Sequence, residues 1–364
     1  MTTPSHALAT RSNLITYVVT TAGVIAALYY GQNLFRPLAL GLLCSILLSA
    51  STEALQKLPT FGAHLKNWMA MALSVLIVLL GLLLVVQILS GQASDVTQAW
   101  PRYVARFEGL LTNLAHWLGE DIASQARIQF SKLDLSSSVP VIASKTGSIL
   151  ADIVMTGLYT AFILATQKSF VHKLPILFPK SQDHLNVKRV MATASKSIRK
   201  YILIKTIMSI ITGLVSYGVL RFLNVDFAET WALLIFLLNY IPTVGSIIGV
   251  IFPAILALVQ FDTFGPFLVI VILLTGAQFT IGNVIEPIFM GKVLNLSALA
   301  VLIALSLWGT MWGVAGMFMS VPITVVFMIF CAHIPAMQWI AILLSEDGRL
   351  DTETDTVISG EETA

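Results

Sequence analysis

Charged residues are scarce in this sequence. Asp, Glu, Lys and Arg make up 11% of its 364 residues, whereas a typical soluble domain carries about 25%. Hydrophobic residues make up 57% of the chain, and its mean hydropathy is +0.86. So few charges exclude a water-exposed globular surface, and the composition predicts an all-α polytopic membrane protein.

Cysteine and the common catalytic motifs are also lacking. The two cysteines, Cys44 and Cys331, fall within apolar runs and fit neither a disulfide framework nor a metal site. The chain has no HExxH sequence, no GxxxxGKS/T phosphate-binding loop and no spaced cysteine–histidine set. We therefore expect no metal, no cofactor, no enzymatic activity and no ATP-driven step within the chain.

Long apolar runs dominate what is present. A membrane span needs roughly 20 apolar residues. The runs of suitable length are 14–30, 34–55, 68–90, 140–166, 201–223, 229–260, 264–282 and 297–332. The first follows a single arginine, Arg11, with no small-residue cleavage site after it, so we expect a retained span. The sequence thus predicts about eight transmembrane helices.

Basic residues are concentrated between the fourth and fifth runs. Segment 167–205 holds nine lysines and arginines against one acid, and loops rich in basic residues stay in the cytoplasm. Counting crossings from there places both termini and the 56–67 loop in the cytoplasm, and segment 91–139 outside. We expect these basic residues to fix the topology and to contact anionic membrane lipid rather than nucleic acid.

The chain divides by composition into six parts. They are the first three spans (1–90), an extracytoplasmic insert (91–139), the fourth span (140–166), a basic cytoplasmic segment (167–200), a core with broken helices (201–332) and an acidic cytoplasmic tail (333–364). In the insert, aromatic and leucine residues recur at helical spacing from Trp100 to Leu118, which predicts an amphipathic helix. Such a helix forms an interfacial aromatic belt, packs on the core or binds substrate.

Two runs of the core contain helix-breaking residues. They are WALLIFLLNYIPTVGSIIGVIFPAILALV (231–259) and LSLWGTMWGVAGMFMSVPITVV (305–326), with Pro242, Gly245, Gly249 and Pro253 in the first and Gly309, Gly313, Gly316 and Pro322 in the second. Broken helices in corresponding positions point to the midplane site of a transporter. The alternative is that the glycines only permit close helix packing. Each run is either a full crossing or a re-entrant hairpin of two half-helices.

A single carboxylate, Glu286, lies between these two runs in the stretch GNVIEPIFMG. Pro287 disfavours a helical conformation before it, so we expect the helix to end or kink here, with Gly291 as a second breaker. A charge at membrane depth costs at least ~2.5–3.5 kcal/mol and usually serves a pathway. At the interface, Glu286 would only mark a helix end. Lys292 is a candidate partner.

These residues resemble the autoinducer-2 exporter (AI-2E) family of bacterial transporters. The resemblance rests on NYIPTVGSIIGVIFPAILAL, GNVIEPIFMGKVLNLSALAVLIALSLWG and GVAGMFMSVPITVV; it is specific in 231–326 and weak before residue 140. It implies a homo-oligomer, such as a pentamer, that moves small molecules or ions outward across the inner membrane. Members differ in substrate, which is a furanose-derived signal for some and sodium exchanged for protons for others.

Polar side chains within the spans are the candidates for a substrate or ion pathway. They are Glu286, Asn283, Gln278, Asn239, Tyr240, Thr243 and Asp152. The uncharged members either hydrogen-bond a hydroxylated substrate or hold helices together. Asp152, on the helical face of Lys145, lines a cavity or lies near water, depending on where its span begins. We expect a gradient-driven carrier; the alternatives are a sodium/proton antiporter and a solute or ion channel.

Overall fold

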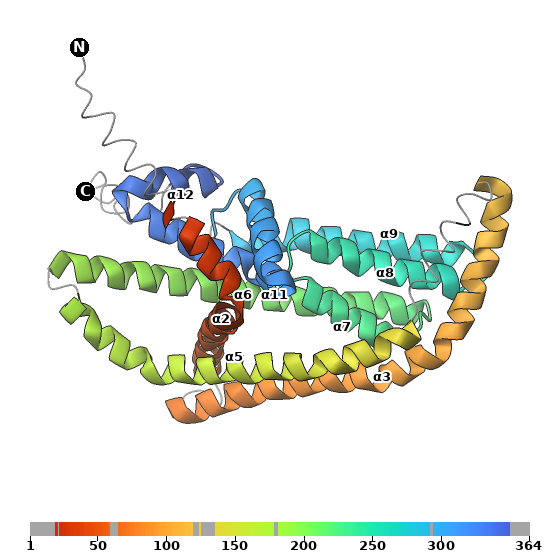
Figure 1. The fold of residues 1–364 in the computed structure, drawn as a ribbon, viewed down its shortest axis with the longest axis horizontal. Helices are drawn as coiled ribbons and strands as arrows, with labels where there is room; N and C mark the ends of the chain where they lie inside the picture. The colour runs from red at the N-terminus through yellow and green to blue at the C-terminus, as the bar shows by residue number, and fades with distance from the viewer. Residues whose placement is uncertain are drawn as a thin grey trace, which may run out of the picture. The chain divides into compact units, whose positions relative to one another are not determined.

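The fold is helical throughout the part of the chain that the structure, a computed structural model, describes (Figure 1). The described residues are 19–20, 22–58, 65–118, 124, 135–177, 181–291 and 294–349. The helices are α2 (Gln32–Gln56), α3 (Asn67–Leu118), α5 (Leu135–Leu177), α6 (Ser181–Phe222), α7 (Ala228–Leu238), α8 (Val244–Gln260), α9 (Gly265–Phe279), α10 (Glu286–Met290), α11 (Ala298–Ala332) and α12 (Gln338–Leu344). A π-helix, η2 (Thr280–Ile285), joins α9 to α10, and a 3-10 turn, η3 (Pro335–Met337), precedes α12. The predicted all-α class is confirmed.

Several of these helices have the length and composition of membrane spans. Among the described residues there are five: Gln32–Gln56, Asn67–Gln92, Val187–Phe222, Gly265–Met290 and Ala298–Ala332. Large apolar side chains remain exposed on them, for example Leu83 of α3 at 62%, as expected of surfaces that face lipid. The predicted run 140–166 lies within α5, and the run 229–260 is two shorter helices. The chain is a multi-pass membrane protein.

The helices group into two compact units. One comprises Met1–Ser45, Asp152–Lys188 and Leu296–Ala364, and the other comprises Ile46–Ala151 and Arg189–Asn295. Glu286 and the broken run 231–259 belong to the second unit, which we call the carboxylate unit. Asp152 and the broken run 305–326 belong to the first. From the sequence we expect both broken runs to converge on one cavity with Glu286, and this stays a prediction.

In the carboxylate unit, α7 and α8 form a hairpin. At 1.5 Å per residue, α7 (11 residues) and α8 (17 residues) are about 16 and 25 Å long, and both are shorter than the ~30 Å hydrocarbon core. Val244 N–H donates to Pro242 O at 2.6 Å, which makes Thr243 (φ 62°, ψ −56°) the centre of a strained γ-turn. The predicted break is present, and its form favours a re-entrant pair of half-helices.

The packing of this unit depends on small residues on α8. A buried apolar cluster unites α6, α7, α8 and α9; its members are Leu220, Val225, Ala228, Ala254, Ala257, Ile270 and Leu274. Figure 1 shows α8 lying between α7 and α9, which both contact it. Trp231 stacks on Phe252 across the hairpin, with ring centroids 6.2 Å apart. The two half-helices are thus held along their length and not only at the turn.

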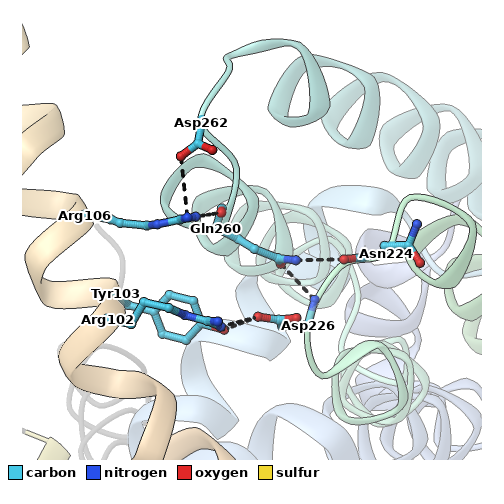
Figure 2. Close-up of polar contacts among 7 residues, drawn as sticks. All are labelled: Arg102, Tyr103, Arg106, Asn224, Asp226, Gln260 and Asp262. Atoms are coloured by element: carbon cyan, nitrogen blue, oxygen red, sulfur yellow. Dashed lines mark hydrogen bonds and ion pairs between the residues drawn. The ribbon is translucent and has the colours of Figure 1, made fainter.

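The last part of α3 packs against loops of the same unit (Figure 2). The Tyr103 hydroxyl donates to Asp226 Oδ2 at 2.6 Å, and Arg102 Nη2 donates to the same oxygen at 2.9 Å. Arg106 donates to the Gln260 carbonyl and lies 3.5 Å from Asp262 Oδ1. Of the three alternatives for the amphipathic helix, the structure favours packing on the core.

The two loops held by α3 are also joined to each other. Gln260 Nε2 donates to the Asn224 carbonyl at 2.7 Å, and Asp226 N–H donates to Gln260 Oε1 at 2.8 Å. Asn224 (φ 53°) and Phe227 (φ 60°) adopt left-handed backbone conformations that ordinary residues rarely adopt. The Gln260 side-chain amide thus links the α6–α7 loop to the C-terminal end of α8.

Removing the Tyr103 hydroxyl should loosen this attachment. In Tyr103→Phe, we expect amide exchange at residues 222–228 to accelerate about fivefold, since one hydrogen bond is worth about 1 kcal/mol.

Burial, followed by the bond to Asp226, raises the pKa of Tyr103 from 10.0 to about 12. Because the folded state then holds the proton more tightly, wild-type stability should fall between pH 10 and 12. That extra fall should be absent from Tyr103→Phe in thermal unfolding measured against pH. An equal fall in both proteins would contradict the assignment.

The other unit contains the second broken run, which also folds back. Gly313 (φ 63°, ψ −143°) interrupts α11. In a straight helix, residues eight positions apart are separated by about 12 Å along the axis. A Cβ built on Gly316 would instead lie 1.9 Å from the Trp308 carbonyl oxygen, so the chain turns back between the two residues. Trp312 Nε1 donates to the Leu28 carbonyl at 3.1 Å. The first run has a comparable close approach, since a Cβ on Gly245 would lie 1.8 Å from the Leu238 carbonyl oxygen.

Candidate functional site

The site is a buried ion pair between α6 and α10. Lys205 Nζ lies 2.7 Å from Glu286 Oε1 and 2.9 Å from Oε2. The side chains are 8% and 14% exposed. Lys205 was expected to be one of the topology-setting lysines, and it is instead the partner of Glu286. The earlier candidate, Lys292, lies outside the described residues.

The backbone at Glu286 is a π-helical turn that continues into α10. The Glu286 N–H donates to the Ile281 carbonyl, five residues back. Proline cannot donate and its ring clashes with the carbonyl four residues earlier, so a widened turn accommodates Pro287 without ending the helix. Of the two outcomes expected from the sequence, an end or a kink, the helix does not end at Glu286 but continues to Gly291 (φ 53°). The interruption takes the form of the π-turn. Such π-turns occur frequently at functional sites.

Apolar residues that neighbour the ion pair along both helices form a buried cluster. Ile204 and Met208 of α6 form a buried cluster with Ile281 of η2, and Ile285 and Met290 pack against it. Such surroundings lower the local dielectric, so the attraction between the charges strengthens while an unpaired charge becomes costly. The pair is therefore stable only while both partners remain charged or both become neutral.

The turn of the α7–α8 hairpin is bonded to the same stretch of α6. Tyr240 donates to Thr206 Oγ1 at 2.8 Å, and Asn239 Nδ2 donates to Ser209 Oγ at 3.0 Å. Tyr201, only 5% exposed, is buried on the same stretch of α6. Three of the predicted residues, Glu286, Asn239 and Tyr240, are thus brought to one helix within two turns of Lys205.

A buried polar stripe continues along α6 from the ion pair. Lys205, Ser209, Thr212 and Ser216 recur at i, i+4, i+7 and i+11, and the last three are fully buried. The Ser216 hydroxyl has no hydrogen-bond partner among the described residues. The stripe spans about 16 Å. Sequence reasoning missed it, although a lysine followed by three small hydroxyl residues at helical spacing in an apolar run is a readable signal.

The other predicted residues have different environments. Gln278 is buried, and a Cβ on Gly249 would lie 3.0 Å from its Nε2, so Gly249 permits close packing of α8 on α9. Asn283 is exposed. Thr243 lies in the γ-turn. Asn283, Gln278 and Thr243 stay candidates for the pathway, and none of the three is hydrogen-bonded to the Lys205–Glu286 pair among the described residues.

Asp152 forms an ion pair in the other unit. Its Oδ2 lies 2.5 Å from Arg36 Nη2 of α2, and the two side chains are 47% and 26% exposed, respectively. The sequence suggested Lys145 as a neighbour, but Arg36 is the partner that the structure provides. Close packing accompanies this pair, because the Thr160 hydroxyl donates to the Gly41 carbonyl at 3.3 Å. The greater exposure of this pair makes it the weaker candidate for a coupling site.

Comparison with known proteins agrees with a membrane transport role. Residues 14–336 match the AI-2E family transporter family. The AI-2 transport protein TqsA of Escherichia coli (strain K12) is 28% identical over 341 residues, which cover 89% of this chain and 92% of that protein. A putative transport protein of Haemophilus influenzae is 28% identical over 339 residues, 90% and 94% of the two chains. Another, from Borreliella burgdorferi, is 32% identical over 195 residues, 53% and 54%. The family and these relatives are named as transport proteins and not as enzymes.

Proposed function

The chain belongs to the AI-2E family of transporters, and we propose that it is a gradient-driven carrier that exports a small polar solute of the autoinducer-2 type. Similarity to the AI-2 transport protein TqsA supports the substrate class. The buried ion pair of Lys205 with Glu286 is the observation that carries the mechanism. A charged pair deep among apolar helices is expensive to maintain and typically marks an ion or proton pathway.

In this mechanism the Glu286 carboxylate releases the Lys205 ammonium group and binds a proton or a cation in its place. Neutralising the carboxylate removes the attraction that holds α10 to α6 and leaves a buried ammonium that must find another partner. The π-turn before Glu286 can tighten to an α-helical turn. This change in the backbone would accommodate the shift of α10. The change reaches the α7–α8 hairpin because its turn is bonded to α6 through Thr206 and Ser209.

The polar stripe of α6 supplies the groups that a hydroxylated solute needs. Ser209 and Ser216 offer hydroxyl donors and acceptors, and Ser216 has no partner among the described residues. Asn239 and Gln278 add buried amides. Several weak hydrogen bonds to a polar solute suit a carrier, which must release what it binds.

We place the protein in the bacterial inner membrane as a homo-oligomer with both termini in the cytoplasm. The excess of basic residues in 167–205 supports this orientation. After Cys44 and Cys331 are replaced, a cysteine at Ser181 should resist a membrane-impermeant thiol reagent in intact cells, while a cysteine at Ser137 should react. Permeabilised cells serve as the control, because both positions should then react. The reverse pattern in intact cells would overturn the orientation.

Flux through reconstituted protein tests the carrier. In proteoliposomes, labelled autoinducer-2 should show saturable uptake and exchange with unlabelled solute on the opposite side, and an imposed proton or sodium gradient should accelerate this uptake.

The sodium/proton antiporter of the same family is the second candidate, because a Lys–Glu pair can bind either cation without a solute. It predicts sodium flux linked to pH change with no effect of autoinducer-2. Linear, non-saturating flux without exchange would indicate a channel and overturn the carrier.

A further inference from the structure

A basic pocket lies between the end of α2 and the first half of α6, within the carboxylate unit. Its volume is about 590 Å³, and it is lined by Ala50, Glu53, Ala54, Lys57, Ala192, Ser195, Lys196, Arg199, Lys200 and Leu203. Four of these side chains are cationic and one is acidic, so the lining has a net charge of +3. The remaining lining is mostly apolar, with Leu203 at 51% exposure. Cationic and apolar groups thus share one concave surface.

Arg199 carries a buried, unused hydrogen-bond donor in this lining. Its Nη1 pairs with Glu53 of α2, and the side chain is 26% exposed. Its Nε is buried and makes no hydrogen bond among the described residues. An unused donor of a charged group is rare in a folded protein. Guanidinium groups bind phosphate through two parallel N–H bonds, which would use this donor after a small rotation of the side chain.

We propose that this pocket binds a phosphate-bearing anion. Two cations on α6, Arg199 and Lys200, contact the phosphate; Lys57 and Lys196 contribute at longer range. Basic pockets between membrane helices on the cytoplasmic side accept anionic lipid headgroups, and the apolar lining suits an acyl chain next to the phosphate. A soluble phosphate ester has the same recognised chemistry without the chain. This site is separate from the Lys205–Glu286 pair and does not depend on the transport mechanism.

Ligand-induced stabilisation of the full-length protein in neutral detergent tests the pocket. The probes are dihexanoyl-phosphatidylglycerol, its uncharged-headgroup counterpart dihexanoyl-phosphatidylcholine, and glycerol 3-phosphate. A ligand that binds only the folded state raises the unfolding temperature with concentration, which gives an apparent Kd. We expect phosphatidylglycerol to stabilise the protein more than phosphatidylcholine, and the difference to shrink at high salt because the contact is ionic.

Variants assign the effect to the pocket. Arg199→Gln with Lys200→Gln should weaken phosphatidylglycerol binding by about 20-fold or more, at roughly fivefold per cation. Glu53→Gln should tighten it several-fold, since it removes the acid from the lining and frees Arg199. Lys188→Gln, an exposed lysine of α6 outside the pocket, is the matched control and should change the Kd less than twofold. If the double variant fails to fold, the tighter phosphatidylglycerol binding expected of Glu53→Gln still tests the pocket.

The comparison between probes identifies the source of the phosphate. Stabilisation by phosphatidylglycerol alone assigns the pocket to a membrane lipid, whereas equal stabilisation by glycerol 3-phosphate assigns it to a soluble phosphate ester. Both results support a phosphate-bearing ligand. Equal binding of phosphatidylcholine, or a phosphatidylglycerol Kd that is unchanged in the pocket variants, would overturn the proposal.

Discussion

Replacing either partner of the buried ion pair alone should abolish transport and destabilise the protein, whereas replacing both should restore stability without restoring transport. Glu286→Gln leaves the Lys205 ammonium in an apolar enclosure, and Lys205→Met leaves the Glu286 carboxylate there. Breaking a buried pair in this way costs about 3–5 kcal/mol. In the variant with both changes no buried charge remains, so most of the loss should be recovered.

From the sequence alone, Glu286→Gln would keep the shape and hydrogen bonding of the side chain and fix it in the neutral state, and we would expect assembly to stay intact. Because Lys205 lies 2.7 Å away, the single change also strands a cation. The double variant is therefore the clean test of coupling, since it separates loss of a proton-binding group from loss of the fold.

The measurements are thermal unfolding in detergent and pH-dependent flux in proteoliposomes. Asp262→Asn is a suitable control because the Arg106–Asp262 pair is exposed, at 40% and 88% for the two side chains; it should cost less than about 1 kcal/mol. Wild-type flux and pH response in the double variant would mean that the pair only holds α10 to α6. The coupling site would then be sought at Arg36–Asp152.

Much of the architecture could be predicted because membrane helices obey a strong compositional rule. Apolar runs of about 20 residues and interruptions by glycine and proline are local features, and they located α2, α3, α9 and both broken runs. Residue-level partners could not be predicted this way. Lys205 and Glu286 are 81 positions apart, and nothing in the sequence around either one identifies the other.

The same limit applies to two details near the site. Pro287 was expected to end or kink a helix, but the outcome depends on whether the preceding turn can widen, which local sequence does not decide. The glycine pattern in the sequence also does not rank Gly245, Gly249, Gly313 and Gly316 by their sensitivity to substitution. Sensitivity depends instead on which atoms face each glycine, and that is a property of the folded hairpin.

Alanine at Gly245 or Gly316 should disrupt the hairpins more than alanine at any other glycine of the broken runs. The new Cβ would lie 1.8 Å from the Leu238 carbonyl oxygen in the first case and 1.9 Å from that of Trp308 in the second. Both oxygens belong to the backbone at the end of a half-helix, so relief requires the hairpin to open. We expect each change to cost about 3 kcal/mol or more and to abolish flux.

Two further alanine variants separate steric from conformational causes. Gly313→Ala meets no atom within 4 Å but requires φ 63° and ψ −143°, a region that only glycine adopts readily, so its cost should be about 1–3 kcal/mol. Gly276→Ala in α9 also meets nothing within 4 Å and lies in regular helix. Alanine is favoured over glycine there by about 1 kcal/mol, so the unfolding temperature should hold or rise.

If Gly245→Ala unfolded at the wild-type temperature and still transported, the tight α7–α8 turn would not be part of the working protein. The strained Thr243 could then no longer be assigned to the transport path.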